Sequence, residues 1–169
     1  KEPMAYILGY KHFWKHKFLT NNSVLIPRPD TELIIEETLR YLPINKSKKI
    51  LDVGTGSGCI ILSLLKERPK CVATALDISK KAINVAKTNA KLHQLDNKIN
   101  FINIDIDKYK SYNYDLIISN PPYINSIDLN RLDDDIKFHE PRLALSGGLD
   151  GFRNLKKVII KSKKLLKIN

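Results

Sequence analysis

Four short apolar runs rich in branched residues are spaced along the chain, and polar or glycine residues follow each of them. They lie at 49–53, 71–76, 99–104 and 114–119. The segments between the first three carry apolar residues at three- and four-residue intervals, which indicates amphipathic helices. Strands that alternate with helices predict an α/β fold with a doubly wound parallel sheet. The last run is expected to be a fully buried strand.

The first thirty residues have a different pattern. Aromatic and basic residues alternate around 13–18, a polar turn follows at 20–23, and 24–26 is apolar again. This pattern predicts a β-hairpin that lies over the domain rather than in the sheet. We therefore expect residues 1–30 to form an N-terminal β-hairpin and linker, and residues 31–169 to form the core.

A proline-rich loop precedes the first helix of the core. Within 26–32, prolines flank Arg28, and Asp30 is a suitable N-cap for the helix that follows. The helix has an apolar stripe, made of Ile35, Leu39 and Leu42. Arg28 could be a surface residue or a fixed cation that faces a ligand.

Composition narrows the possible functions. The 169 residues suit one domain, and no run of eighteen apolar residues predicts a membrane span. The formal net charge of +11 would suit a nucleic acid, but the lysines form no stripe with interleaved aromatic residues, so we interpret it as a generally basic surface. Cys59 and Cys71 lack Cys-x-x-Cys spacing, which is typical of a reducing compartment and makes the cytoplasm the expected location.

A glycine loop follows the first strand of the core. Residues 54–58 read Gly-Thr-Gly-Ser-Gly and lead into a helix. Alternate glycines allow a ligand to approach the backbone closely and leave N–H groups at the helix start for a carboxylate. A dinucleotide fingerprint would need its third glycine where this chain has Cys59, so pyrophosphate binding is disfavoured. Asp52, ahead of the glycines, is instead suited to a cationic ligand.

Carboxylates follow the next two strands. Asp77 ends the second strand, where a carboxylate can hold both hydroxyls of a ribose. Asp105 ends the third strand and Asp107 follows, and either could receive an adenine amino group or cap a turn. These groups fit S-adenosylmethionine, whose methyl transfer needs only in-line placement of the nucleophile. No metal site is predicted, because His12 and His16 would form a metal pair only on a helix.

The tetrapeptide Asn120-Pro121-Pro122-Tyr123 follows the last strand. Its prolines remove backbone donors and stiffen the loop, which leaves carbonyl groups free. The Asn120 side-chain oxygen and the Pro121 carbonyl could accept both hydrogens of a planar NH2 group, against the flat ring of Tyr123. Such a site suits an amide or an aromatic amine. An X-Pro-Pro turn without function is the alternative for the tetrapeptide alone.

These residues resemble class I S-adenosylmethionine-dependent methyltransferases, which have a Rossmann-like sheet. The likeness rests on 52–58, Asp77 and 120–123. Within that class, the chain is similar to the release factor glutamine N5-methyltransferases of the HemK type. Three further stretches carry this narrower likeness, namely 3–9 with Phe13, 26–32 and 140–151.

The resemblance implies a role for each site residue. The residues that would bind S-adenosylmethionine, and its product S-adenosylhomocysteine, are Gly54, Thr55, Gly56, Ser57, Gly58, Asp77, Asp105, Ile106 and Asn120. The catalytic residues would be Asn120, Pro121 and Tyr123. Together with Pro122, they would hold the glutamine amide of the Gly-Gly-Gln loop in a peptide chain release factor, the expected protein partner. The family often has an aromatic residue in place of Ile106.

The chain departs from that family at both ends. The family normally begins with a small helical domain and continues with further strands after the helix that we expect at 154–166. We therefore expect a chain that is truncated at both ends, with the strand at 114–119 as an exposed apolar edge. Fusion to further domains in a longer protein remains open.

Two other functions remain open. Adenine N6 in DNA or RNA presents the same NH2 geometry, and a flipped adenine would stack on Tyr123. The stretches 26–32 and 140–151 favour the glutamine enzymes, so direct nucleic-acid binding is not expected. A non-catalytic, cofactor-binding fragment is the second alternative, because strands are expected to be missing.

Overall fold

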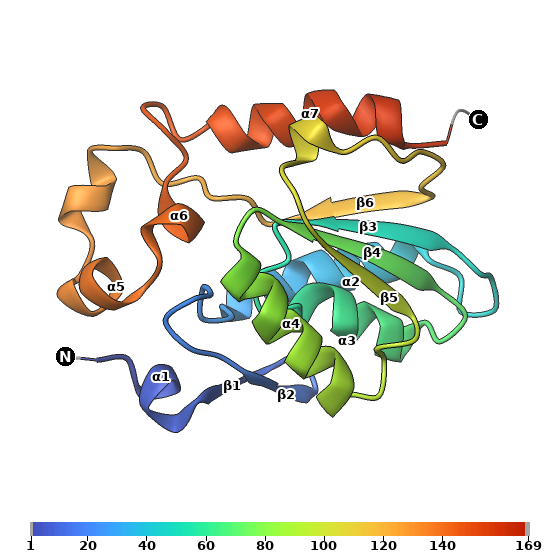
Figure 1. Ribbon diagram of the computed structural model, residues 1–169, viewed down its shortest axis with the longest axis horizontal. Coiled ribbons are helices and arrows are strands. Elements are labelled where there is room, and N and C mark those ends of the chain that lie inside the picture. Colours follow the sequence, from blue (N-terminus) through green and yellow to red (C-terminus); the bar gives the residue numbers. More distant parts are fainter. Residues whose placement is uncertain (1, 168–169) are drawn as a thin grey trace.

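A four-stranded parallel sheet forms the centre of the molecule (Figure 1). The computed structural model describes residues 2–167. Within them, the strand order is β5-β4-β3-β6, and all neighbouring strands are parallel. The strands are β3 (Lys49–Val53), β4 (Val72–Asp77), β5 (Ile99–Asn103) and β6 (Leu116–Ser119). The predicted α/β fold with a parallel sheet is confirmed.

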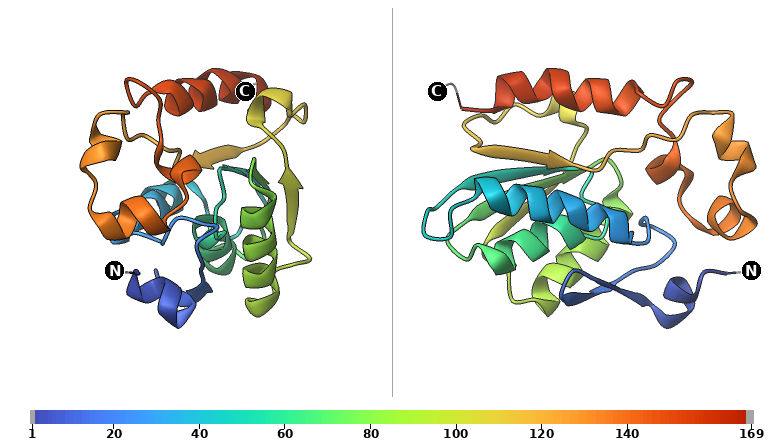
Figure 2. Two further views of the ribbon diagram at one scale, coloured as in Figure 1. Left: turned by 60° about the vertical axis from the view of Figure 1, so that its left-hand side comes forward. Right: turned by 180° about the vertical axis from the view of Figure 1, so that it is seen from behind.

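Helices cover both faces of the sheet, so the predicted doubly wound arrangement is also confirmed (Figures 1 and 2). One face carries α2 (Glu32–Tyr41), α3 (Cys59–Glu67) and α4 (Lys80–Leu92), and the other carries α7 (Arg153–Leu165). Successive side chains of β3 point to opposite faces. Ile50 therefore joins the core on the α3 side, whereas Leu51 joins the core on the α7 side.

An antiparallel hairpin lies outside the main sheet, below α3 and α4 in Figure 1, as predicted. It consists of β1 (Tyr10–Phe13) and β2 (His16–Leu19), and the short helix α1 (Met4–Leu8) precedes it. The sequence did not indicate α1. The helix has only five residues and buries none of them, so no apolar stripe marks it.

The turn of the hairpin lies earlier than predicted. A two-residue loop that begins at Trp14 joins β1 to β2, whereas 20–23 lies after the hairpin and 24–26 is not a strand. Trp14 has a φ of 55°, as tight hairpin loops require. Its backbone N–H donates to Glu32 Oε1 at 2.6 Å, and its indole N–H donates to Glu67 Oε1 at 2.9 Å. The predicted turn position is therefore wrong because distant partners stabilise Trp14.

A buried asparagine on α4 links the hairpin to the glycine loop. Asn89 Nδ2 donates to the Leu19 carbonyl at 3.0 Å and to the Ser57 carbonyl at 2.8 Å. Its Oδ1 accepts from the Leu19 N–H at 2.7 Å. One fully buried side chain thus connects the hairpin to residues 54–58.

The first core helix begins after a 3-10 turn, η1 (Pro29–Thr31). Asp30 lies inside this turn, so the prediction that Asp30 is the N-cap of the helix is wrong. Thr31 occupies the position before α2 and makes no side-chain capping bond. The fixed φ of Pro29 explains the difference, because it suits the start of a helical turn one residue before Asp30.

β6 is an edge strand in the described part of the chain, with β3 as its strand neighbour. Three of its four residues are only partly buried, so the prediction of a fully buried strand is wrong. β6 pairs with β3 along one edge, and no strand among the described residues covers its other edge, so its side chains are less buried. Just before β6, Tyr114 forms a parallel bridge with Leu166, which follows α7.

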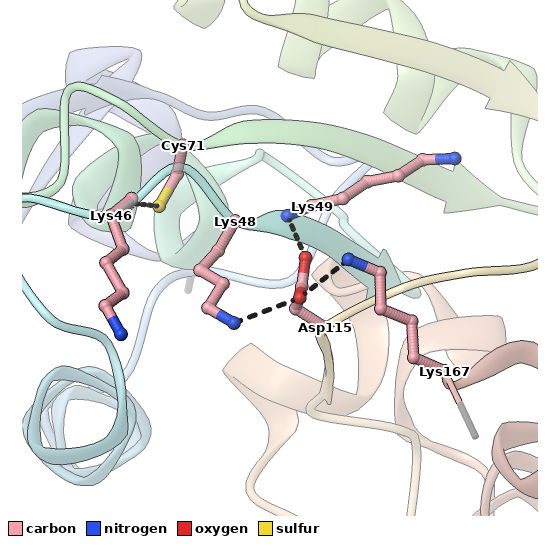
Figure 3. Close-up of polar contacts among 6 residues, drawn as sticks. All are labelled: Lys46, Lys48, Lys49, Cys71, Asp115 and Lys167. Atoms are coloured by element: carbon pink, nitrogen blue, oxygen red, sulfur yellow. Dashed lines mark hydrogen bonds and ion pairs between the residues drawn. The ribbon is translucent and has the colours of Figure 1, made fainter. Parts of the chain in front are cut away.

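A charged cluster anchors the beginning of β6 to the start of β3 (Figure 3). Asp115 accepts the Lys49 N–H at 2.7 Å, the Lys48 ammonium at 3.1 Å and the Lys167 ammonium at 2.9 Å. Burial opposes ionisation of the carboxyl, but these three hydrogen bonds outweigh it and lower the pKa of Asp115 to about 2. Asp115 is therefore ionised at neutral pH.

The segment between β6 and α7 forms a separate lobe beside the sheet (Figure 1). It contains η3 (Asp128–Arg131), α5 (Asp134–His139) and α6 (Arg142–Leu145). Outside this lobe, the 3-10 helix η2 (Ile106–Lys108) follows β5.

Within residues 2–167, no helix combines the length and hydropathy of a membrane span. The same residues contain no group of three His, Cys, Asp or Glu side chains that could hold a metal ion.

Candidate active site

A cleft of about 340 Å³ lies at the carboxyl edge of the sheet. It lies beside β3. The chain continues from β3 to β4 and β5 on one side of this strand, whereas β6 pairs with its other side. Such a switch in direction is the usual ligand position in open α/β sheets. Residues that end or follow all four strands line it, namely Gly54, Asp77, Asp105 and Asn120. The cleft has the size of a small-molecule site, which typically measures about 300–1,000 Å³.

Backbone hydrogen bonds to the end of β4 and within the loop hold the glycine loop in place. The N–H groups of Gly54 and Thr55 donate to the Leu76 carbonyl at 2.9 and 3.0 Å, and Gly58 donates to Thr55 at 2.8 Å. Gly54, Thr55, Gly56 and Ser57 line the cleft, whereas Gly58 does not. Gly58 has a φ of +81°, and a Cβ there would come within 3.1 Å of Leu62, so its role is to let the loop pack against α3.

Asp77 fastens this loop to the start of α4. Its Oδ2 accepts the Gly56 N–H at 2.9 Å and its Oδ1 accepts the Ser79 N–H at 2.8 Å. Burial raises the pKa of Asp77 above its ordinary value. A carboxylate offers about four lone-pair positions, so two remain for ligand hydroxyls in the cleft.

The two carboxylates after β5 have different positions. Asp105 lines the cleft with buried Ile106, whereas Asp107 does not. Asp105 also caps η2 and lies 2.7 Å from the ammonium of Lys157, which lies 2.8 Å from Asp107. Sequence reasoning did not find Lys157. Lys157 and Asn154 are three residues apart, so they lie on the same face of α7, and both line the cleft. This spacing points to the cleft only once α7 is known to cover the strand ends.

The predicted tetrapeptide separates the cleft from a second cavity of about 440 Å³. Asn120, Pro121 and Pro122 line both cavities, and Tyr123 lines only the second. Within residues 2–167, no donor reaches the Pro121 carbonyl, and the Asn120 side chain has one hydrogen bond, from Nδ2 to Thr31 Oγ1 at 3.2 Å. The tetrapeptide therefore presents two acceptors, Asn120 Oδ1 and the Pro121 carbonyl, between the two cavities.

Arg28 also lines both cavities, which supports the second of its two sequence interpretations. It forms an ion pair with Glu140, whose side chain is 1% exposed. The other oxygen of Glu140 accepts the Ile26 N–H at 3.3 Å. Because one buried carboxylate holds both groups, the guanidinium has a fixed place at the junction of the cavities. Sequence reasoning named the stretch around Glu140 but not this contact.

Two glycines of the stretch 140–151 pack directly behind Tyr123. A Cβ added to Gly147 would lie 2.7 Å from Tyr123 Cα, and one added to Gly151 would lie 2.5 Å from the Tyr123 carbonyl oxygen. Asn154 Nδ2 donates to the Pro122 carbonyl at 3.2 Å and to the Ser146 carbonyl at 3.0 Å. The position of the tetrapeptide therefore depends on this distant stretch.

Comparison with known families decides what kind of protein has this site. The family model of the methyltransferase small domain matches residues 31–136, which is more than half of the chain. The chain belongs to this methyltransferase family.

Curated relatives of this methyltransferase include the release factor glutamine methyltransferases of Caulobacter vibrioides, 41% identical over 152 residues, and Buchnera aphidicola, 39% identical over 165 residues. The matches cover 89% and 98% of this chain, but 53% and 59% of the two relatives. A bifunctional methyltransferase of Rickettsia bellii is 38% identical, over 99% of this chain and 35% of the relative. The chain thus spans somewhat more than half the length of the first two relatives.

A solved structure from Nostoc punctiforme, assigned to the O-methyltransferases, has the same fold. The TM-score is 0.53 at 16% identity, over 82% of this chain and 34% of that chain. The shared part supports the Rossmann-like methyltransferase sheet that the sequence predicts.

The methyltransferase cleft fits S-adenosylmethionine. Asp52 lies beneath the glycine loop, 1% exposed, and neither of its carboxylate oxygens has a hydrogen-bond partner among the described residues. Asp52 does not line the cleft itself, but it precedes the glycine loop that does. A buried, unpaired carboxylate is costly, and the ammonium group of a bound methyl donor would lower that cost across the loop. The free acceptor positions of Asp77 suit a ribose, and Ile106, which lines the cleft, would offer an apolar contact to an adenine ring.

Asp52 gives this methyltransferase a predictable dependence of stability on pH. Burial raises the pKa of Asp52 from 3.8 to about 7. The native chain then holds a proton that the unfolded chain has lost, so the free energy of unfolding falls as pH rises from about 4 to about 7, by about 4 kcal/mol if this group acts alone. We expect Asp52→Asn to flatten this fall in cofactor-free protein, as measured by urea unfolding at pH 4.5 and 8. Equal falls in wild type and variant would contradict the burial of an unpaired carboxyl.

A second prediction concerns the packing behind Tyr123. Gly147→Ala should reduce methyl transfer about 10-fold or more, because the new methyl group collides with backbone atoms and shifts the tetrapeptide. Gly148→Ala is the matched control. Its new Cβ meets only the Arg153 side chain, at 3.2 Å, although its φ of +90° strains an alanine. Initial rates measure the effect of the collision on the tetrapeptide, and melting temperatures measure the general loss of stability from backbone strain. Equal activity in both variants would contradict a packing role for Gly147.

Proposed function

We propose that this chain is the catalytic core of a protein-glutamine N5-methyltransferase that uses S-adenosylmethionine and acts on the Gly-Gly-Gln glutamine of peptide chain release factors in the cytoplasm. One observation carries the proposal. Two unpaired acceptors, Asn120 Oδ1 and the Pro121 carbonyl, lie between a cleft that fits the methyl donor and a second cavity open to an acceptor. The relatives named release factor glutamine methyltransferase support the choice of acceptor.

The acceptors suit an amide nitrogen for a chemical reason. The nitrogen of a glutamine side chain is a weak nucleophile because its lone pair is delocalised into the carbonyl group. When Asn120 Oδ1 and the Pro121 carbonyl each accept one N–H, the nitrogen is aimed at the neighbouring cleft. The same two oxygens stabilise the positive charge that develops on nitrogen during attack. S-adenosylmethionine supplies the electrophilic methyl group when bound.

Tyr123 and the second cavity would receive the rest of the substrate. Tyr123 is 66% exposed, so its ring is available to a ligand. Leu25, Ile34, Leu132, Ile136 and Leu145 contribute the apolar part of the same cavity. Such a lining suits the methylene groups of a glutamine and the small residues beside it.

The test is transfer of a labelled methyl group from S-adenosylmethionine. A release factor, the same factor with its motif glutamine changed to alanine, and duplex DNA are offered in parallel. We expect label on the intact factor alone. Label on DNA would replace the proposal with adenine methylation, and cofactor binding without transfer to any acceptor would leave only a binding function. A chain extended to the full length of the relatives should run alongside, because the present chain spans 46% to 60% of the release factor enzymes.

A further inference from the structure

We propose that Thr31 is a positioning residue that holds the Asn120 amide with its oxygen towards the acceptor nitrogen of the substrate. The inference rests on the proposed function, because it concerns the orientation that the reaction needs. Asn120 Nδ2 donates to Thr31 Oγ1 at 3.2 Å, and within residues 2–167 the Asn120 side chain makes no other hydrogen bond. Among the described residues, Thr31 is thus the hydrogen-bond partner that anchors this amide.

Only one orientation of the Asn120 amide can serve the reaction. A half-turn about its last side-chain bond exchanges the NH2 group for the oxygen, and this torsion has no strong preference of its own. If the NH2 group faced the cavity, its hydrogens would meet those of the substrate amide. Thr31 Oγ1 is placed to accept from Nδ2 in the productive orientation. The substrate N–H can only donate, so it excludes the flipped form, in which the Thr31 hydroxyl would donate to Oδ1.

Thr31 is itself held in place. It is 9% exposed, its χ1 is restricted by β-branching, and its N–H donates to the Arg28 carbonyl at 3.0 Å within η1. The buried Glu140 carboxylate holds Ile26 and Arg28 just before that turn. Both Thr31 and Asn120 line the cleft and the second cavity. A rigid loop thus brings a hydroxyl oxygen to the amide at the point where the two cavities meet.

Two substitutions distinguish this role from packing. Thr31→Val keeps the shape of threonine and removes the hydroxyl, whereas Thr31→Ser keeps the hydroxyl and removes a methyl group. We expect Thr31→Val to lower kcat roughly 10- to 100-fold, since a half-buried amide loses its acceptor. Thr31→Ser should stay within about threefold of wild type. The opposite order, with valine active and serine impaired, would overturn the proposal.

Cofactor binding distinguishes a loss of orientation from a general structural defect, because only the general defect would weaken it. The Kd of S-adenosylhomocysteine, measured by calorimetry, should change less than about threefold in both variants. In an Asn120→Ala background, Thr31→Val should cause no further loss of kcat, because there is no amide left to orient. An additional 10-fold loss in that background would assign the effect to something other than Asn120.

A measurement without turnover separates this inference from the proposed function. If wild type methylates the release factor but Thr31→Val does so equally well, only the role of Thr31 fails. If wild type methylates nothing, the proposed function fails, and NMR still decides the role of Thr31. The side-chain NH2 signals of Asn120, assigned by their loss in Asn120→Ala, should move in Thr31→Val and stay near wild-type positions in Thr31→Ser. Identical signals in all Thr31 forms would overturn the proposal.

Discussion

Asn120→Ala should reduce methyl transfer to glutamine by about 100- to 1,000-fold, because it removes the acceptor that aims the nitrogen and stabilises its developing charge. Cofactor affinity should remain within a few fold, since Gly54 to Ser57, Asp77 and Ile106 line the cleft independently of Asn120. Single-turnover transfer of labelled methyl and calorimetric binding of S-adenosylhomocysteine measure the two quantities separately. Asn84→Ala is a matched control, because Asn84 is exposed on α4, outside both cavities.

The result has two informative alternatives. A parallel loss of binding and turnover in Asn120→Ala would mean that Asn120 belongs mainly to the cofactor site. Unchanged turnover would mean that the Pro121 carbonyl orients the substrate without the amide. Either outcome contradicts the proposed division of roles.

Asp77→Ala should weaken S-adenosylhomocysteine binding by about 100-fold or more. The change removes two potential hydrogen bonds to ribose hydroxyls and leaves the Gly56 and Ser79 N–H groups without their acceptor. The loss of these backbone contacts should also lower the free energy of unfolding by about 1–3 kcal/mol. Calorimetry measures the binding, and urea unfolding measures the stability.

The loss of affinity and the loss of stability at Asp77 have separate controls. Ser79→Ala removes the hydroxyl that caps α4, an acceptor for the Ala82 N–H at 3.2 Å, without changing the carboxylate. It should cost similar stability and leave cofactor affinity nearly unchanged. If Asp77→Ala bound cofactor as well as Ser79→Ala does, the ribose role of Asp77 would be wrong.

The parts of the fold that local patterns determine were predicted from the sequence. The four parallel strands and the helices after 54–58 and Asp77 follow from branched runs, helical spacing and glycine placement. The hairpin turn was misplaced because Trp14 adopts its φ of 55° with help from Glu32 and Glu67, far along the chain. Helix α1 was missed because it buries no residue.

In the candidate site, too, the residues set by local patterns are predicted from the sequence and those that depend on distant contacts are not. Asp77 and the tetrapeptide were found because they end strands, and the ends of parallel strands meet at one edge of a sheet. The contact of Arg28 with Glu140 spans 112 residues, and that of Lys157 with Asp105 spans 52. No spacing in the sequence predicts such pairs. They depend on how the lobe after β6 and helix α7 fold back over the sheet.

Asn89 is a direct physical link between the N-terminal hairpin and the glycine loop. Its side chain bonds Leu19 in the hairpin and Ser57 in the loop, and Ser57 lines the cleft. A ligand that changed the position of Ser57 would therefore act on the amide that also holds Leu19. By linkage, a protein bound to the hairpin would then change the affinity of the glycine loop for that ligand by the same factor. The methyl donor and a protein bound at the hairpin, far from the reacting atoms, would then change each other's affinity through the side-chain amide of Asn89.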